Sequence, residues 1–103
     1  MTDYAFHPEA LNDLDEIWEF IARDNVDAAD RIVAQVLATC EDLSRLPHQG
    51  HHRPELSSRP LRFAVVRDYL LAYAPHESPL WVVAILHGKR HPRILAAILR
   101  DRV

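Results

Sequence analysis

The pattern of apolar and polar positions has a helical period in the first half of the chain and an extended one in the second. From Pro8 to Arg23, and again from Asp24 and Asn25 to Pro47, apolar residues recur every three or four positions opposite a charged face. Each segment opens with a helix-start signal, a proline in the first case and an Asp-Asn pair in the second. Because about two residues separate the predicted helices, they must pack as an antiparallel hairpin.

Three extended segments follow a turn-rich linker at residues 47–55 and are predicted at residues 61–66, 69–74 and 80–86. A tight turn at Arg67 and Asp68 should join the first two, so the three form an antiparallel meander. Pro92 opens a short amphipathic helix, and residues 4–6 form a short extended run before the first helix. The C-terminal helix places Ile94, Leu95, Ile98 and Leu99 on one side and Arg93, Arg100 and Arg102 on the other.

In the segment at residues 80–86, both sets of alternating positions are apolar, so both faces of a strand formed there would be apolar. Leu80, Val82, Ala84 and Leu86 form one set, and Trp81, Val83 and Ile85 form the other. A strand with two apolar faces is typical of the centre of a sheet, where both faces are covered. Seven residues cannot cross a bilayer, which needs about 20 in a helix.

These elements predict an α+β fold in a single domain over residues 1–103. The order is a strand, an antiparallel helical hairpin, a three-stranded antiparallel meander and a short C-terminal helix. The hairpin should cover one face of the sheet. Because the C-terminal helix is small, we expect the second face to be left for an external partner.

Charge divides the chain into two halves of opposite sign. Residues 1–50 carry 3 Lys/Arg against 11 Asp/Glu, a net charge of −8, while residues 51–103 carry 9 against 4, a net charge of +5. The basic half either neutralises the acidic hairpin or forms a surface for a nucleic acid or an acidic partner. We read no export signal and no membrane span, which predicts a cytoplasmic protein. The single Cys40 is expected to be a small buried residue.

The predicted central strand runs directly into His87-Gly88-Lys89-Arg90. A glycine permits a sharp turn, which would display an imidazole, an ammonium and a guanidinium group at the end of the sheet. This elbow is the main candidate binding feature of the sequence.

The whole chain resembles the RelE/ParE toxin superfamily, and its ParE branch in particular. The resemblance rests on residues 13–18, the helix end at Cys40, Leu43, Leu46 and Pro47, the segments Gly50 to Leu56, Leu61-Arg62 and Tyr69–Tyr73, and above all residues 83–90. The family commonly has an aspartate where this chain has His91.

The resemblance implies the toxin of a type II toxin–antitoxin pair, which forms a hetero-oligomer with a cognate antitoxin. The ParE branch implies inhibition of DNA gyrase by binding, and the RelE branch implies ribosome-dependent cleavage of mRNA. For the first activity we select Arg62, His87, Gly88, Lys89 and Arg90 as target contacts. A small adaptor without toxicity is a third hypothesis.

Cleavage of RNA needs a base, a cation on the phosphate and an acid for the leaving oxygen. Glu55, Arg62 and His87 could take these roles, as in one RelE-like subgroup. The chain has no aromatic residue after Trp81 to stack a base, which favours binding over catalysis. The structural alternatives are an ion pair of Glu55 with Arg53 or Arg59, and a hydrogen bond of His87 with the backbone.

Histidines are frequent, and three of them, His48, His51 and His52, lie close together in the linker. A zinc site needs about four ligands held in a fixed geometry, and this segment offers no cysteine. We therefore predict no metal and no other cofactor.

Overall fold

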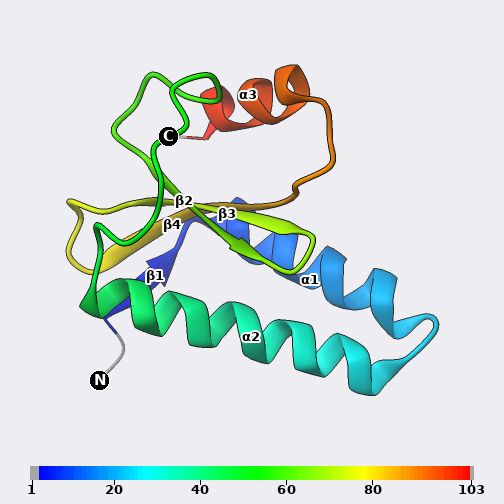
Figure 1. Cartoon of the computed structure of the whole chain (residues 1–103). Helices are drawn as coiled ribbons and strands as arrows, with labels where there is room; N and C mark the ends of the chain where they lie inside the picture. The colour runs from blue at the N-terminus through cyan, green and yellow to red at the C-terminus, as the bar shows by residue number, and fades with distance from the viewer. Residues whose placement is uncertain (1–2, 103) are drawn as a thin grey trace.

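The computed structural model describes residues 3–102 and has the predicted order of elements (Figure 1). They are β1 (Tyr4–Phe6), α1 (Pro8–Ala22), α2 (Val26–Arg45), β2 (Arg62–Val66), β3 (Tyr69–Ala74), β4 (Leu80–His87) and α3 (Pro92–Asp101). The α+β class is confirmed, and α1 and α2 form the predicted hairpin beneath the sheet. Within residues 3–102, no helix is both long and apolar enough to cross a membrane.

Side-chain caps explain where the helices begin. Asn25 accepts a hydrogen bond from the Ala28 amide at 3.0 Å and so caps α2. His7 and His91 do the same for α1 and α3, each through Nδ1 and each directly before a proline.

The sheet has the order β1-β4-β3-β2, which confirms β4 as a central strand. β2, β3 and β4 form the predicted antiparallel meander. The sheet as a whole is mixed rather than antiparallel, because β1, which was expected only as a short extended run, joins β4 in parallel. Three residues carry too little pattern to reveal that pairing from the sequence.

A β-bulge changes which residues of β4 share a face. Ala72 pairs with Ala84 but Tyr73 pairs with Val82, so Val83 is an extra residue on β4. The alternation of side chains between the two faces of the sheet is therefore interrupted at Val83. Leu80, Val82 and Ile85 pack toward the helical hairpin, while Trp81, Val83, Ala84 and Leu86 pack on the opposite face.

The expectation that the second face of the sheet is open is wrong. Leu95 and Leu99 of α3 cover it, together with Leu56 and Leu61 from the segment before β2. All four are at most 3% exposed. The long loop contributes as much cover as the helix, and a loop's packing has no periodic signal in the sequence.

Candidate functional site: a groove at the free edge of β4

A buried ion pair fixes the C-terminal end of the chain to α1. Arg102 Nη2 donates to Asp13 Oδ1 at 2.9 Å, and Arg102 Nη1 donates to Asp13 Oδ2. Both side chains are only 11% exposed. These hydrogen bonds raise the pKa of Arg102 above its usual range, so its charge is permanent. Placing Arg102 on the solvent side of α3 was wrong, although Arg93 and Arg100 are exposed as predicted.

The same pair also binds the backbone of β4. Asp13 Oδ2 accepts from the Ile85 amide at 3.0 Å, and Arg102 Nη1 donates to the Val83 carbonyl at 3.3 Å. Arg59 holds the other side of the helix end, where its Nη1 donates to the carbonyls of Leu99 and Arg102. α3 is thus anchored by its C-terminal end, and the elbow at its N-terminal end is left exposed.

Backbone contacts hold the elbow after β4 in one shape. The Gly88 amide donates to the Asp68 carbonyl at 2.8 Å, and the Lys89 amide donates to His87 Nδ1 at 3.3 Å. The predicted backbone bond of His87 is confirmed. Lys89 and Arg90 are exposed. Gly88 does not have a positive φ, so the turn does not need the conformational freedom of glycine.

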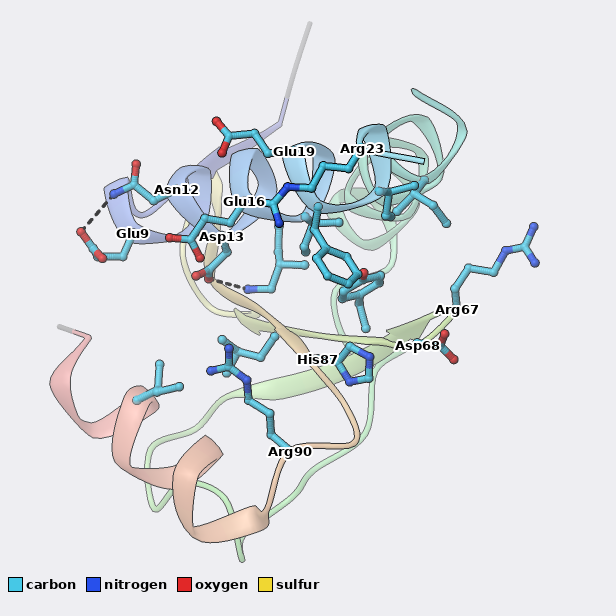
Figure 2. A pocket seen from close by; sticks show the side chains of 18 of the residues that line it. Glu9, Asn12, Asp13, Glu16, Glu19, Arg23, Arg67, Asp68, His87 and Arg90 are labelled. Carbon is cyan, nitrogen blue, oxygen red and sulfur yellow. Dashed lines mark hydrogen bonds between the residues drawn. The ribbon is translucent and has the colours of Figure 1, made fainter. Parts of the chain in front are cut away.

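A groove with a volume of about 980 Å³ runs along the free edge of β4, between α1 and the elbow (Figure 2). His87 and Arg90 line it, while Lys89 lies outside its lining. Its apolar surface comes from α1, α2, β3, β4 and α3, through Ile17, Phe20, Ile21, Ile32, Tyr69, Ile85, Leu86 and Ile98. Phe20 is 69% exposed and adds apolar surface to the groove.

The charges of the groove are separated along its length. Glu9 and Glu16 lie on α1 toward one end, beside Asp13, whose charge is balanced by its ion pair with Arg102. Arg67 and His87 lie toward the other end, with Asp68 beside them, while the side chains of Arg23 and Arg90 reach back toward the middle of the groove (Figure 2). A bound segment would therefore meet the carboxylates of Glu9 and Glu16 first and the guanidinium groups of Arg23, Arg90 and Arg67 afterwards.

Arg62 lies away from this groove and is engaged with the protein itself. Its Nη1 donates to the carbonyls of His48 at 3.0 Å and Gly50 at 2.7 Å. Tyr73 holds the same turn, because its hydroxyl donates to the Pro47 carbonyl at 2.8 Å and accepts from the Gly50 amide at 2.9 Å. Arg62 thus connects β2 to the turn after α2.

The three residues selected for RNA cleavage are not brought together in this chain. Arg62 pairs with Tyr73 and His87 pairs with Tyr69, four residues along β3, so they are separated by roughly 13 Å along the strand direction. Glu55 forms the predicted ion pair with Arg53, at 2.8 Å. That hydrogen bond holds the pKa of Glu55 below its usual value, which makes its carboxylate a weaker base.

The histidines of the linker do not assemble a metal site within residues 3–102, where no three metal-ligating side chains form a group. His51 and His52 are exposed, and the ring of His48 lies 5.4 Å from that of His76, centre to centre. Cys40 is fully buried as predicted. Burial raises the pKa of its thiol to about 12, so it is unreactive near neutral pH.

Sequence reasoning missed three residues of the groove. Asp13 and Arg102 are ordinary charged residues in amphipathic helices, and nothing in one sequence pairs two residues 89 positions apart. Phe20 offered a signal, because it falls outside the apolar stripe of α1 that Leu14, Ile17 and Ile21 define. An aromatic residue on a charged helix face suggests a contact surface.

These features define a small α+β protein with a charged, partly apolar groove suited to a macromolecular partner. Residues 4–92 match the family described as the ParE toxin of type II toxin-antitoxin system, parDE. A curated relative, "Putative toxin Y4kP" of Sinorhizobium fredii (strain NBRC 101917 / NGR234), is 30% identical over 93 residues, 84% of this chain and 88% of the relative. The chain therefore belongs to the ParE toxin family, and membership implies a cognate antitoxin.

Proposed function

We propose that this toxin inhibits DNA gyrase by binding it in the cytoplasm, without a cofactor, and that the cognate antitoxin relieves the inhibition. Membership of the ParE family supports the toxin part of this proposal. The observation that supports inhibition of gyrase by binding is the structure of the elbow after β4. Lys89 and Arg90 are exposed on a turn whose backbone is fixed by Asp68 and His87.

A fixed pair of cations suits contact with carboxylates of a protein or with phosphates of DNA, because both form charge-assisted hydrogen bonds with Lys and Arg. Gly88 keeps the elbow free of a side chain next to those cations, and His87 positions the Lys89 amide. Such contacts inhibit by occupancy and need no turnover.

Purified toxin and purified gyrase provide the test. We expect inhibition of supercoiling that saturates as toxin is added. Toxin stripped of metal with EDTA and dialysed before it enters the Mg²⁺-ATP assay should inhibit equally well, because binding requires no metal of the toxin's own. Total RNA incubated with the toxin and ribosomes should stay intact. Unchanged supercoiling at a large excess of toxin would refute gyrase as the target.

Ribosome-dependent cleavage of mRNA is the second candidate. One observation favours it: the imidazole of His87 lines the same groove as the guanidinium groups of Arg67 and Arg90. An acid beside phosphate-binding cations is what cleavage of RNA needs. Transcript fragments after induction, with gyrase activity preserved, would establish this alternative.

A further inference from the structure

The groove beside β4 has the backbone groups of an incomplete sheet. β1 covers the edge of β4 only as far as Val82, whose carbonyl accepts from the His7 amide at 2.9 Å. Beyond that point the edge of β4 faces the groove. α1 lies on one side of this edge and α3 on the other (Figure 1).

The register shows which backbone groups point outward. The Gly88 amide bonds to the Asp68 carbonyl, so the pairs with β3 at Leu70/Leu86 and Ala72/Ala84 are the hydrogen-bonded ones. Ile85 and His87 belong to the alternate pairs, and their amides and carbonyls point away from β3.

Two of these four outward groups already have partners. The Ile85 amide donates to Asp13, and the His87 carbonyl accepts from the Arg90 amide at 3.1 Å. Within residues 3–102, the Ile85 carbonyl and the His87 amide make no hydrogen bond. One acceptor and one donor therefore face the groove, on either side of Leu86.

This pair of groups matches one residue of a parallel strand. In parallel pairing, each residue of one strand lies opposite a residue of the other strand. Its amide donates to the carbonyl of the residue that precedes this opposite residue, and its carbonyl accepts from the amide of the residue that follows it. A residue opposite Leu86 would therefore bond to the Ile85 carbonyl and the His87 amide. An antiparallel strand would also need the Ile85 amide or the His87 carbonyl, which are taken. β1 already pairs with β4 in parallel, so a strand bound here would continue the line of β1 along the same edge of β4.

We propose that the groove binds an extended segment of the antitoxin as a fifth strand, parallel to β4, with apolar residues at its centre, basic residues before them and acidic residues after them. The inference rests on the proposed neutralisation by an antitoxin. Leu86 faces the α3 side, so the central residue points toward Ile98 and its neighbours point toward Ile17 and Phe20.

The charges of the groove favour the same direction. A strand parallel to β4 begins near the carboxylates of Glu9 and Glu16 and ends near the elbow and the guanidinium group of Arg67. Basic residues at its start and acidic residues at its end complement both regions. Hydrogen bonding and charge, two independent features, thus select one orientation.

Two synthetic peptides of identical composition test the orientation by amide NMR titration of the whole toxin. Acetyl-Lys-Lys-Ile-Val-Ile-Glu-Glu-amide has the favoured charge order, and acetyl-Glu-Glu-Ile-Val-Ile-Lys-Lys-amide has the reverse. We expect the first to bind at least about threefold more tightly at low salt. The His87 amide should show the largest shift and become protected from exchange. N-methylation of the central valine should weaken binding at least about fivefold, because it removes the donor to Ile85.

Charge reversal in the toxin provides the matched control. Glu16→Lys combined with Arg90→Glu should reverse the preference, so that the second peptide binds more tightly. Asp15→Lys combined with Arg93→Glu makes the same change of charge at exposed positions outside the groove and should preserve the original preference.

Several results would overturn the inference: no binding at millimolar peptide, equal binding in both charge orders, no effect of N-methylation, or helical shifts in the bound peptide. The titration uses no measure of toxicity. Its failure therefore leaves gyrase inhibition and neutralisation open, whereas a toxin that fails to inhibit gyrase could still bind the first peptide.

Discussion

Asp13 and Arg102, 89 residues apart in the chain, form a two-pronged ion pair that also bonds to the backbone of β4. The pair joins α1, β4 and the end of α3 at one point. It also closes one side of the groove, so the stability of the domain and the shape of its candidate site depend on the same two side chains.

Asp13→Ala should therefore be one of the most destabilising substitutions in the chain. It leaves the buried guanidinium of Arg102 and the Ile85 amide without their acceptor, and loss of one partner of a buried pair costs about 3 to 5 kcal/mol. Urea unfolding followed by circular dichroism measures this change. The exposed pair of Glu41 and Arg45 is the control, and Glu41→Ala should change stability by at most about 0.5 kcal/mol. Equal effects would show that Asp13 is not a central anchor.

Two glycines should respond differently to replacement by alanine. A Cβ at Gly50 would lie 2.4 Å from the Tyr73 hydroxyl and 2.9 Å from the Phe63 carbonyl oxygen. The Tyr73 side chain is buried and the carbonyl belongs to the backbone of β2, so neither atom can easily move aside. Gly50→Ala must disrupt the turn that Tyr73 and Arg62 hold, at a cost of about 1 to 3 kcal/mol. A Cβ at Gly88 meets only the Asp68 carbonyl, at 3.3 Å.

We therefore expect Gly88→Ala to unfold near the wild-type urea midpoint and Gly50→Ala well below it. If Gly88→Ala proved as unstable as Gly50→Ala, the elbow would need its glycine for the fold itself.

Much of the architecture was predictable, because it follows from local pattern. Helical spacing and the cap residues located α1 and α2, and the two-sided apolar run located β4 as a central strand. The parallel pairing of β1 and the bulge at Val83 were not predictable, since both depend on distant partners.

The candidate site was predictable only where it follows one strand. The elbow at residues 87–90 is contiguous in the sequence, and the structure places it at the end of β4 as expected. The groove beside it combines five elements, and its charge separation arises from the position of α1 relative to β4. Arg62 looked equally available in the sequence, but its guanidinium contacts two backbone carbonyls.

The thiol of Cys40 should make stability depend on pH in the alkaline range. Burial raises its pKa from an ordinary 9.0 to about 12, so between these values the unfolded chain loses a proton that the folded chain keeps. Stability is thus fully present below pH 9 and falls as pH rises toward about 12. At pH 10 the loss from this group is on the order of 1 kcal/mol.

Urea unfolding at pH 8 and pH 10 tests the effect by comparison with Cys40→Ala. The variant is less stable at both pH values, because the substitution leaves a cavity. Between pH 8 and pH 10, however, it should lose less stability than the wild type, by on the order of 1 kcal/mol. The same alkaline loss in both proteins would show that other groups cause it.

Arg62 offers a test that separates structure from target contact. Arg62→Gln loses charge-assisted bonds to the carbonyls of His48 and Gly50, so we expect a destabilisation of about 1 to 3 kcal/mol. If its role is only to hold the turn, the folded variant should inhibit gyrase with unchanged potency. A large loss of potency in a fully folded sample would instead make Arg62 a target contact, as its selection from the sequence predicts.

Reversal of the elbow charges should abolish toxicity without unfolding the protein. Lys89→Glu with Arg90→Glu replaces two exposed cations, and changes at such positions alter stability by about 0.5 kcal/mol or less. Charge-assisted contacts with gyrase or its DNA would become repulsive. We expect induced cells to grow normally and the purified variant to leave supercoiling unaffected, with a wild-type circular dichroism spectrum.

Arg93→Glu with Arg100→Glu makes the same change of charge on the exposed side of α3 and should remain toxic, because those residues lie outside the elbow and the groove. Glu55→Gln should also remain toxic, since binding needs no base. If Glu55→Gln abolished toxicity and the wild-type protein fragmented transcripts, the elbow would serve cleavage of RNA and the binding mechanism would be wrong. If both charge-reversed variants lost toxicity to the same extent, net charge rather than the elbow would determine toxicity.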